Sequence, residues 1–262
     1  MEVRAVNFIE CVMDAHSFVF ENLGKVYLYA LPILILVSAS ELIQAFFIRG
    51  IYQYFFLAIP FLLYSIYAVS WHRFAALGKN SGNLIAFYSF GVREIKYAIL
   101  SAIALFTPLF ALTLLGFRFQ STANQLAIIL FIFLPISLFV LSALPSIALD
   151  QKFEPALFMK TGIKNVMTIL IGVVFIFVLC LILMGAWWVV TWFIADISKN
   201  LVIHLILSIS GHFVISPIIL AFTTTCLSIF YVKAIGVDGL GTSIQVPIND
   251  GKVGNEIEKL GK

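Results

Sequence analysis

Long apolar stretches separated by short polar segments make up most of this chain. They run at about 26–48, 51–71, 97–117, 126–149, 166–188 and 211–232. Each is long enough to cross the hydrocarbon core of a bilayer, which takes about 20 apolar residues in a helix. The pattern therefore predicts an all-α polytopic membrane protein with six transmembrane helices.

The connections between these stretches alternate between very short turns, such as Arg49-Gly50, and longer polar segments. A short turn joins antiparallel neighbours, so we expect three hairpins: helices one and two, three and four, and five and six. Within 7–21, before the first span, polar and apolar residues occupy opposite faces of a helix, which is typical of a helix lying in the membrane interface. Similar segments at 84–96 and 155–165 precede the third and fifth spans. The chain thus divides into three repeated units, each an amphipathic interfacial helix followed by a hairpin.

The distribution of basic residues predicts the orientation in the membrane. Of the 16 Lys and Arg residues, all but Arg49, Arg118 and Lys199 lie on one side of the predicted spans. Loops with an excess of Lys and Arg stay in the cytoplasm during insertion. We therefore expect both the N-terminus and the C-terminus to be cytoplasmic.

The overall composition agrees with a membrane protein. Hydrophobic residues make up 62% of the chain, charged residues only 11%, and the mean hydropathy is +1.07, which excludes an ordinary soluble domain. Residues 1–233 form one predicted transmembrane domain, and 234–262, rich in Gly, Asp, Asn and Lys, form a predicted flexible cytoplasmic tail. No nucleic-acid partner is expected.

One group of polar residues falls inside the predicted spans. Glu41 lies within the first span, with Ser38 and Gln44 three residues to either side, and Ser216 in the last span falls at a similar depth, one helical turn from His212. An acid inside the membrane is expensive and is a functional candidate by default. Two interpretations stay open: a proton or cation site, or an acid hydrogen-bonded near the outer interface.

The histidines and cysteines do not suggest a metal site. His204 and His212 share one helical face but lie about 12 Å apart along a straight helix, which is too far to hold one ion together. Cys11, Cys180 and Cys226 are far apart in the sequence, and two of them lie in apolar stretches. We therefore expect no metal, no cofactor and no disulfide framework.

Charged residues at the predicted cytoplasmic ends of the spans suggest two further sites. Arg73 and Asp150 end the second and fourth helices at equivalent positions in the repeat, so we predict a structural ion pair between them. Basic residues of the second and third interfacial segments are predicted contacts for anionic lipid headgroups. These are Arg93, Lys96, Lys160 and Lys164.

Two short motifs carry a resemblance to a known family. They are Trp71-His72-Arg73 followed by Leu77-Gly78, and the Leu-Pro-Ser-Ile-Ala-Leu-Asp stretch at 144–150 followed by Pro155-Ala156-Leu157. From about 7 to 232 the chain resembles bacterial six-helix inner-membrane proteins related to the membrane domain fused to some glycerophosphodiester phosphodiesterases. The resemblance implies the six-helix architecture and the bacterial inner membrane. In the fused relatives the phosphodiesterase chemistry belongs to a soluble domain that nothing in this sequence matches, so that activity is not carried over.

The sequence offers no recognisable reaction centre. It contains no GxSxG, HExxH, CxxC or Walker pattern in a fitting context. We predict a non-enzymatic membrane protein that binds membrane lipids, anionic ones on the cytoplasmic face, or serves as a scaffold for partner proteins or further copies of itself. The alternative prediction is a small-solute transporter or channel with a polar site near Glu41.

Overall fold

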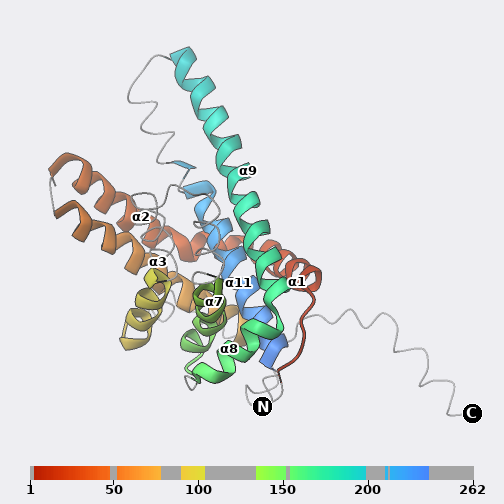
Figure 1. Ribbon diagram of the computed structural model, residues 1–262. Helices are drawn as coiled ribbons and strands as arrows, with labels where there is room; N and C mark the ends of the chain where they lie inside the picture. The colour runs from red at the N-terminus through yellow and green to blue at the C-terminus, as the bar shows by residue number, and fades with distance from the viewer. Residues whose placement is uncertain are drawn as a thin grey trace, which may run out of the picture.

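The computed structural model describes residues 3–47, 52–77, 90–103, 134–151, 154–198, 210–211 and 213–235. Within these ranges every regular element is a helix, so the predicted all-α class is confirmed. The labelled helices are α1 (Phe8–Glu21), α2 (Leu23–Phe47), α3 (Tyr52–Leu77), α7 (Leu134–Ala148), α8 (Pro155–Lys164), α9 (Val166–Ser198) and α11 (Ser216–Ile235). Residues 92–103 form a further helical segment (Figure 1).

Three of these helices are long and apolar enough to cross a membrane. They are Leu23–Gln44 within α2, Val166–Ile194 within α9, and Ser216–Ile235, which is α11. The chain is thus a helical protein with several candidate membrane spans. Of the third predicted span the structure describes residues only as far as 103, and of the fourth only those from 134 onward.

Helix α1 begins and ends at asparagine residues. The side chain of Asn7 accepts a hydrogen bond from the backbone N–H of Ile9 at 3.0 Å, which caps the free N–H groups of the first turn. At the other end the backbone N–H of Asn22 donates to the carbonyl of Phe18, and its own carbonyl accepts from Val26 in the next helix. The chain therefore changes direction at Asn22 and continues at once into α2.

Helix α8 has the same plan. It starts with Pro155, where the missing N–H costs nothing because the first turn has no acceptor for it, and it ends at Asn165, which leads directly into α9. Both α1 and α8 are short helices directly before a candidate span, as the sequence predicts for interfacial segments. The described part of the segment at 84–96 begins at residue 90 and becomes helical at Val92.

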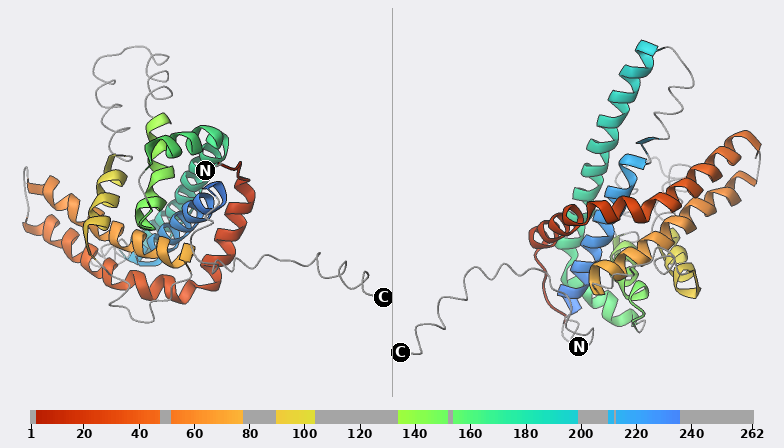
Figure 2. Two further views of the ribbon diagram at one scale, coloured as in Figure 1. Left: turned by 90° about the horizontal axis from the view of Figure 1, so that it is seen from below. Right: turned by 180° about the vertical axis from the view of Figure 1, so that it is seen from behind.

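The bundle is built around α11, which packs against α1, α2, α3 and α7. Helices α2 and α3 lie side by side and extend to one side of the bundle, while α9 projects from it in another direction (Figures 1 and 2). The largest buried cluster joins α1, α2, α3 and α11 around Trp71 and Tyr67. Along most of α9 the apolar side chains are exposed, as expected for a helix surrounded by lipid.

Candidate functional site

Consecutive residues near the end of α3, His72 and Arg73, connect this helix to its neighbours through polar contacts. The His72 side chain is fully buried. Its Nδ1 lies 2.6 Å from the hydroxyl of Ser228 in α11, and its Nε2 lies 2.9 Å from the hydroxyl of Tyr97 in the helical segment 92–103. One imidazole therefore links three helices.

The direction of these hydrogen bonds follows from the number of protons available. The Ser228 hydroxyl donates its single proton to the backbone carbonyl of Thr224, at 2.9 Å. The Nδ1 of His72 then donates to Ser228, and in a neutral imidazole its Nε2 accepts from Tyr97. This chain is complete with a neutral imidazole, so it holds the helices together without a charge.

The residue before His72 makes a parallel contact. The indole N–H of Trp71 donates to the hydroxyl of Thr225 at 2.9 Å, and that hydroxyl donates to the carbonyl of Ala221. Trp71 is fully buried and stacks on Tyr67 with ring centroids 5.8 Å apart. Polar contacts at Trp71 and His72 thus fix how α3 is rotated against α11.

The next residue of α3, Arg73, belongs to an ionic cluster. The structure brings the predicted partners Arg73 and Asp150 together, with Nη1 2.5 Å from Oδ2. It adds a second guanidinium, because Arg93 Nη1 lies 2.8 Å from the same carboxylate oxygen. Arg73 also donates to the carbonyl of Ala148 at the end of α7, at 3.4 Å. The cluster therefore joins α3, α7 and the segment 92–103.

Asp150 adopts a backbone conformation that usually belongs to glycine. Its φ is 56°. Its N–H donates to the carbonyl of Ile147, and the N–H of Gln151 donates to that of Ser146, which is the Schellman arrangement that ends many helices. Aspartate tolerates this left-handed conformation better than most residues, and its carboxylate serves the two arginines. One residue thus ends α7 and anchors the ionic cluster.

Glu94 completes the cluster from the buried side. Only 1% of its side chain is exposed. It accepts from Arg93 Nε at 2.9 Å and from the backbone N–H of Gly91 at 2.8 Å, which caps the helical segment from its third position. Burial alone lowers the pKa of Arg93, but hydrogen bonds and charge from Glu94 and Asp150 outweigh it and raise that pKa. Arg93 therefore stays charged, and its charge is matched within the protein.

The residues predicted to contact lipid headgroups differ in their surroundings. Arg93 makes ion pairs with Asp150 and Glu94, and about a fifth of its side chain, 21%, is exposed. The ammonium of Lys164 donates to the backbone carbonyl of Val3, although much of its side chain is exposed. Lys96 and Lys160 also lie exposed. Lys96, Lys160 and the outer part of Lys164 are thus open to the surroundings of the protein.

The second predicted site, around Glu41, is assembled only in part. Ser216 and Tyr64 of α3 line the same small cavity, and Glu41 is near enough to Tyr64 for its charge to act on that phenol. Ser38 is buried, whereas Glu41 and Gln44 are half-buried, and His212 lies outside the described residues. A cavity of about 10 Å³ borders Tyr64 and Ser216. It is at the lower limit for holding one water molecule.

Extended residues at the start of the chain are fastened to the junction of α8 and α9. The buried side chain of Asn165 accepts from the N–H of Val6 at 2.8 Å and donates to the carbonyl of Arg4 at 3.2 Å. The Thr168 hydroxyl donates to the carbonyl of Val6, and the N–H of Arg4 donates to the carbonyl of Ala234 at the end of α11. We call residues 3–6 the N-terminal strap.

Several of these residues were missed at the level of sequence. His72, Tyr97 and Ser228 come from three separate helices, so no local spacing relates them. A histidine at the inner end of an apolar stretch was a usable signal, as was Glu94 three residues after Gly91, which is the spacing of a capping box. The two-sided contact of Asn165 with the strap had no such signal.

Metal binding finds no support in the described part of the chain. Among these residues, no group of three or more His, Cys, Asp or Glu side chains is placed to hold an ion. Cys11, Cys180 and Cys226 are free thiols. The polar clusters around His72 and Asp150 connect neighbouring helices. In the cluster around Asp150, each charge has a partner of opposite sign.

Comparisons with known proteins add no relative. No family model matches the chain, and neither a curated protein nor a solved structure matches it. The family resemblance of the two sequence motifs therefore stays a prediction.

Proposed function

We propose that the protein is a non-enzymatic membrane component whose cytoplasmic face binds anionic lipids. The proposed architecture has six spans in three hairpins, with both termini in the cytoplasm of a bacterial cell. One observation carries the proposal: short helices beside the spans present lysines and exposed apolar side chains together. Such a surface suits the boundary between acyl chains and charged headgroups.

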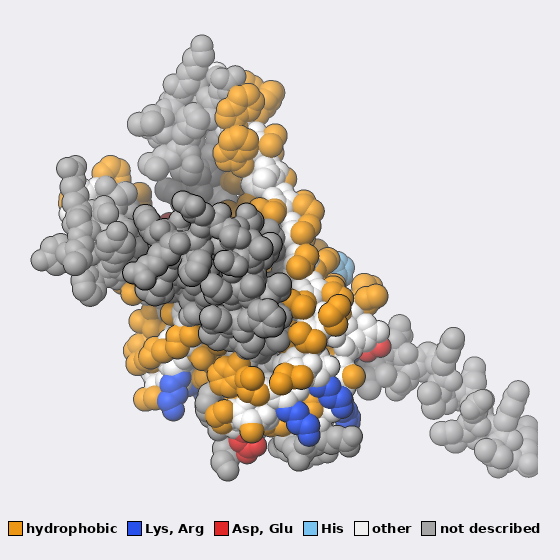
Figure 3. Space-filling model, in the orientation of Figure 1, with side chains coloured by type: hydrophobic (Ala, Val, Ile, Leu, Met, Phe, Trp, Pro, Cys, Tyr) orange, Lys and Arg blue, Asp and Glu red, His pale blue; other side chains and the backbone are white. Residues whose placement is uncertain are grey.

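Helix α8 is the clearest case. Met159 and Ile163 are exposed on it, and Lys160 and Lys164 directly follow them in the sequence. In Figure 3 the lysine and arginine side chains gather at the end of the molecule where α8 lies, and hydrophobic side chains continue from there along α9. Apolar groups that enter the membrane bring the neighbouring ammonium groups to headgroup level.

The segment at 90–96 has the same combination. Phe90, Val92 and Ile95 are exposed, and Lys96 follows Ile95 just as Lys164 follows Ile163. This likeness supports the proposed repeat of interfacial helix and hairpin. It also gives the lipid surface two basic elements instead of one.

Helix α1 contributes apolar surface but no Lys or Arg, and it carries three acids, Glu10, Asp14 and Glu21. Ile9, Met13 and Phe20 are exposed by more than half of their side-chain area. Two of its acids, Glu10 and Asp14, lie 3.4 and 2.8 Å from the ammonium of Lys233 in α11. We therefore assign the anionic-lipid preference to α8 and the segment 90–96, and only membrane anchoring to α1.

The test compares two spin-labelled lipids in bilayers that contain the full-length protein. We expect more phosphatidylglycerol than phosphatidylcholine to be immobilised at low salt, with the difference falling as salt screens the charges. The double variant Lys96→Gln/Lys160→Gln should lose most of the preference, since a lysine near an anionic surface contributes about 1 kcal/mol. Glu154→Gln is the matched control and should strengthen it, because an exposed acid beside α8 is removed. Equal immobilisation of both lipids at low salt would overturn the proposal.

A transporter or channel is the second candidate, favoured by the cavity that Tyr64 and Ser216 line and by the charge of Glu41 near Tyr64. Its test is water access to position 41. In a background without the three native cysteines, Glu41→Cys is exposed to a membrane-impermeant thiol reagent from each side. Labelling of this cysteine from the periplasm that a solute blocks supports transport. If the cysteine is not labelled in the folded protein, transport loses its support and lipid binding is the only proposal left.

A further inference from the structure

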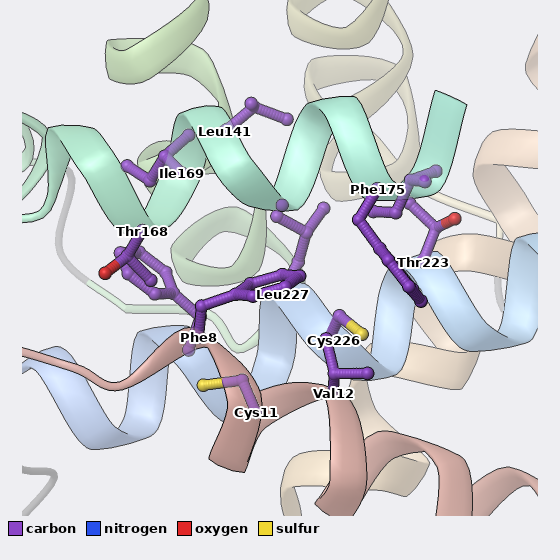
Figure 4. Close-up of a pocket in the computed structure, with 13 residues that line it drawn as sticks. Phe8, Cys11, Val12, Leu141, Thr168, Ile169, Phe175, Thr223, Cys226 and Leu227 are labelled. Atoms are coloured by element: carbon purple, nitrogen blue, oxygen red, sulfur yellow. The ribbon is translucent and has the colours of Figure 1, made fainter. Parts of the chain in front are cut away.

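A small apolar cavity lies beneath α1. It has a volume of about 70 Å³, is lined by α1, α9 and α11, with Leu141 of α7 at its edge, and is open on part of its surface (Figure 4). Carbon and sulfur atoms dominate its lining, and Thr168 and Thr223 supply the hydroxyl groups in it. A cavity lined in this way does not hold water well, because water needs two or more polar partners.

The position of the cavity matches one leaflet of a bilayer. Its lining begins at Thr168, near the start of α9, and reaches Ile176. These nine residues, eight steps of 1.5 Å, cover about 12 Å along a helix. Half of a hydrocarbon core is roughly 15 Å thick, so the cavity lies at the depth of acyl chains beside the α8 end of the molecule.

Helix α1 covers this cavity and is held there at three places. Phe8 packs edge-on against Phe175, with ring centroids 5.7 Å apart. A side chain at Gly172 would meet the Phe8 ring at 3.3 Å, so the glycine leaves room for that ring. Lys233 pairs with the acids of α1, and the N-terminal strap holds the chain just before the helix through Val6. Helix α1 also packs on α11 and buries Ala15 and Val19 in the largest core cluster, so it is a fixed wall of the cavity.

We infer that this cavity is a binding site for a segment of a phospholipid acyl chain from the cytoplasmic leaflet, with α1 as one of its walls. The inference rests on the proposed lipid-binding function and assigns it a second, headgroup-independent contact. The bilayer is the source of apolar chains around α9 and α11, and a cavity of this size takes a short piece of a chain rather than a whole lipid. Exposed Ile9 and Met13 keep α1 in the interface, beside the chains that enter.

The experiment uses the full-length protein in nanodiscs with phosphatidylcholine that carries a photoreactive diazirine in its acyl chain. Irradiation followed by digestion and mass spectrometry maps the labelled residues. We expect labels on Phe8, Ile169 or Leu227 in addition to the lipid-facing surface. Cys226→Leu fills the cavity and should reduce these labels severalfold, and Thr223→Leu, a second filling variant, should do the same.

The matched control is Cys180→Leu, the same change on α9 at a residue that does not line the cavity. It should leave the cavity labels unchanged. Labels confined to exposed residues of α9, or cavity labels that persist in both folded filling variants, would overturn the inference. The probe lipid is zwitterionic, so its labelling does not depend on a preference for anionic lipids. Cavity labelling without an anionic-lipid preference would overturn only the proposed function. An anionic-lipid preference without cavity labelling would overturn only the acyl-chain site.

Discussion

Arg73 and Asp150 join the ends of α3 and α7, although 77 residues separate them in the chain. Asp150 has a left-handed backbone conformation at this position. Among the non-glycine residues that the structure describes, it is the only one with a positive φ. At this one residue the ionic contact stabilises the fold, whereas the backbone strain destabilises it. Substitutions at Asp150 can separate the two.

At Asp150 we predict that alanine is worse than glycine. Both changes remove the ion pairs, but only alanine keeps a Cβ at φ 56°, which costs about 1 kcal/mol. Glycine should stay within about 1 kcal/mol of the original protein, because half-exposed ion pairs contribute little. Thermal unfolding in detergent measures both variants. Equal stability of Asp150→Ala and Asp150→Gly would mean that the left-handed conformation is not retained.

The bond between His72 and Tyr97 predicts a non-additive pair of substitutions. His72→Leu strands the buried Tyr97 hydroxyl and Tyr97→Phe strands the Nε2 of His72, each at about 1–3 kcal/mol. The double variant removes both the Nε2 of His72 and the hydroxyl of Tyr97, so neither group is left buried without the other. The double variant should therefore lose less stability than the sum of the two single losses. A simple sum in the same unfolding assay would contradict the hydrogen bond.

Cys11 should resist thiol reagents while α1 stays in place. Burial raises its pKa to about 11; Lys233 acts in the opposite direction, and Asp14 and Glu10 add to the increase. The thiolate is the reactive form and exists only as pH approaches that value, so at pH 7 roughly one thiol in ten thousand is ionised. We expect no maleimide on Cys11 at pH 7 until SDS unfolds the protein, as read by mass spectrometry. Rapid labelling of the folded protein would instead report that α1 lifts from α9 and α11 often.

Loss of Asn165 should release the N-terminal strap. Asn165→Leu removes the acceptor for the N–H of Val6, so hydrogen exchange at that amide should quicken by about tenfold or more. Thr168→Val is the control, because it removes only a donor to the carbonyl of Val6 and leaves its N–H bonded. Unchanged exchange at Val6 in Asn165→Leu, or an equal increase in both variants, would count against the strap.

Structural features were predictable from the sequence when they depend on neighbouring residues in the chain. The start of α8 was predictable because Pro155 after Glu154 is a local signal, and α1 was predictable from one helical period. The sequence predicted an apolar span at 166–188 but not how far the helix continues beyond it; α9 ends at Ser198, because the length of a membrane span does not limit the length of a helix. A span estimate counts apolar residues, whereas α9 continues through Asp196.

The candidate sites follow the same rule. Arg73 and Asp150 came to attention because they occupy equivalent places in a repeat, but the ion pair of Arg93 was not predicted, since nothing in the sequence relates it to Asp150. His72, Tyr97 and Ser228 meet only after three helices have packed. Long-range contacts of this kind depend on the rotation of each helix about its axis, which an almost uniformly apolar sequence leaves unspecified.

The length of α9 makes this protein sensitive to the membrane around it. Its apolar part, Val166–Ile194, has 29 residues and is about 44 Å long, against a hydrocarbon core of roughly 30 Å. Such a mismatch is relieved by tilting the helix or by thickening the bilayer locally. The first turns of α9 pack on α1 and α8, whereas its exposed part beyond them is free to respond, so we expect bilayer thickness to act mainly on that far part of the helix.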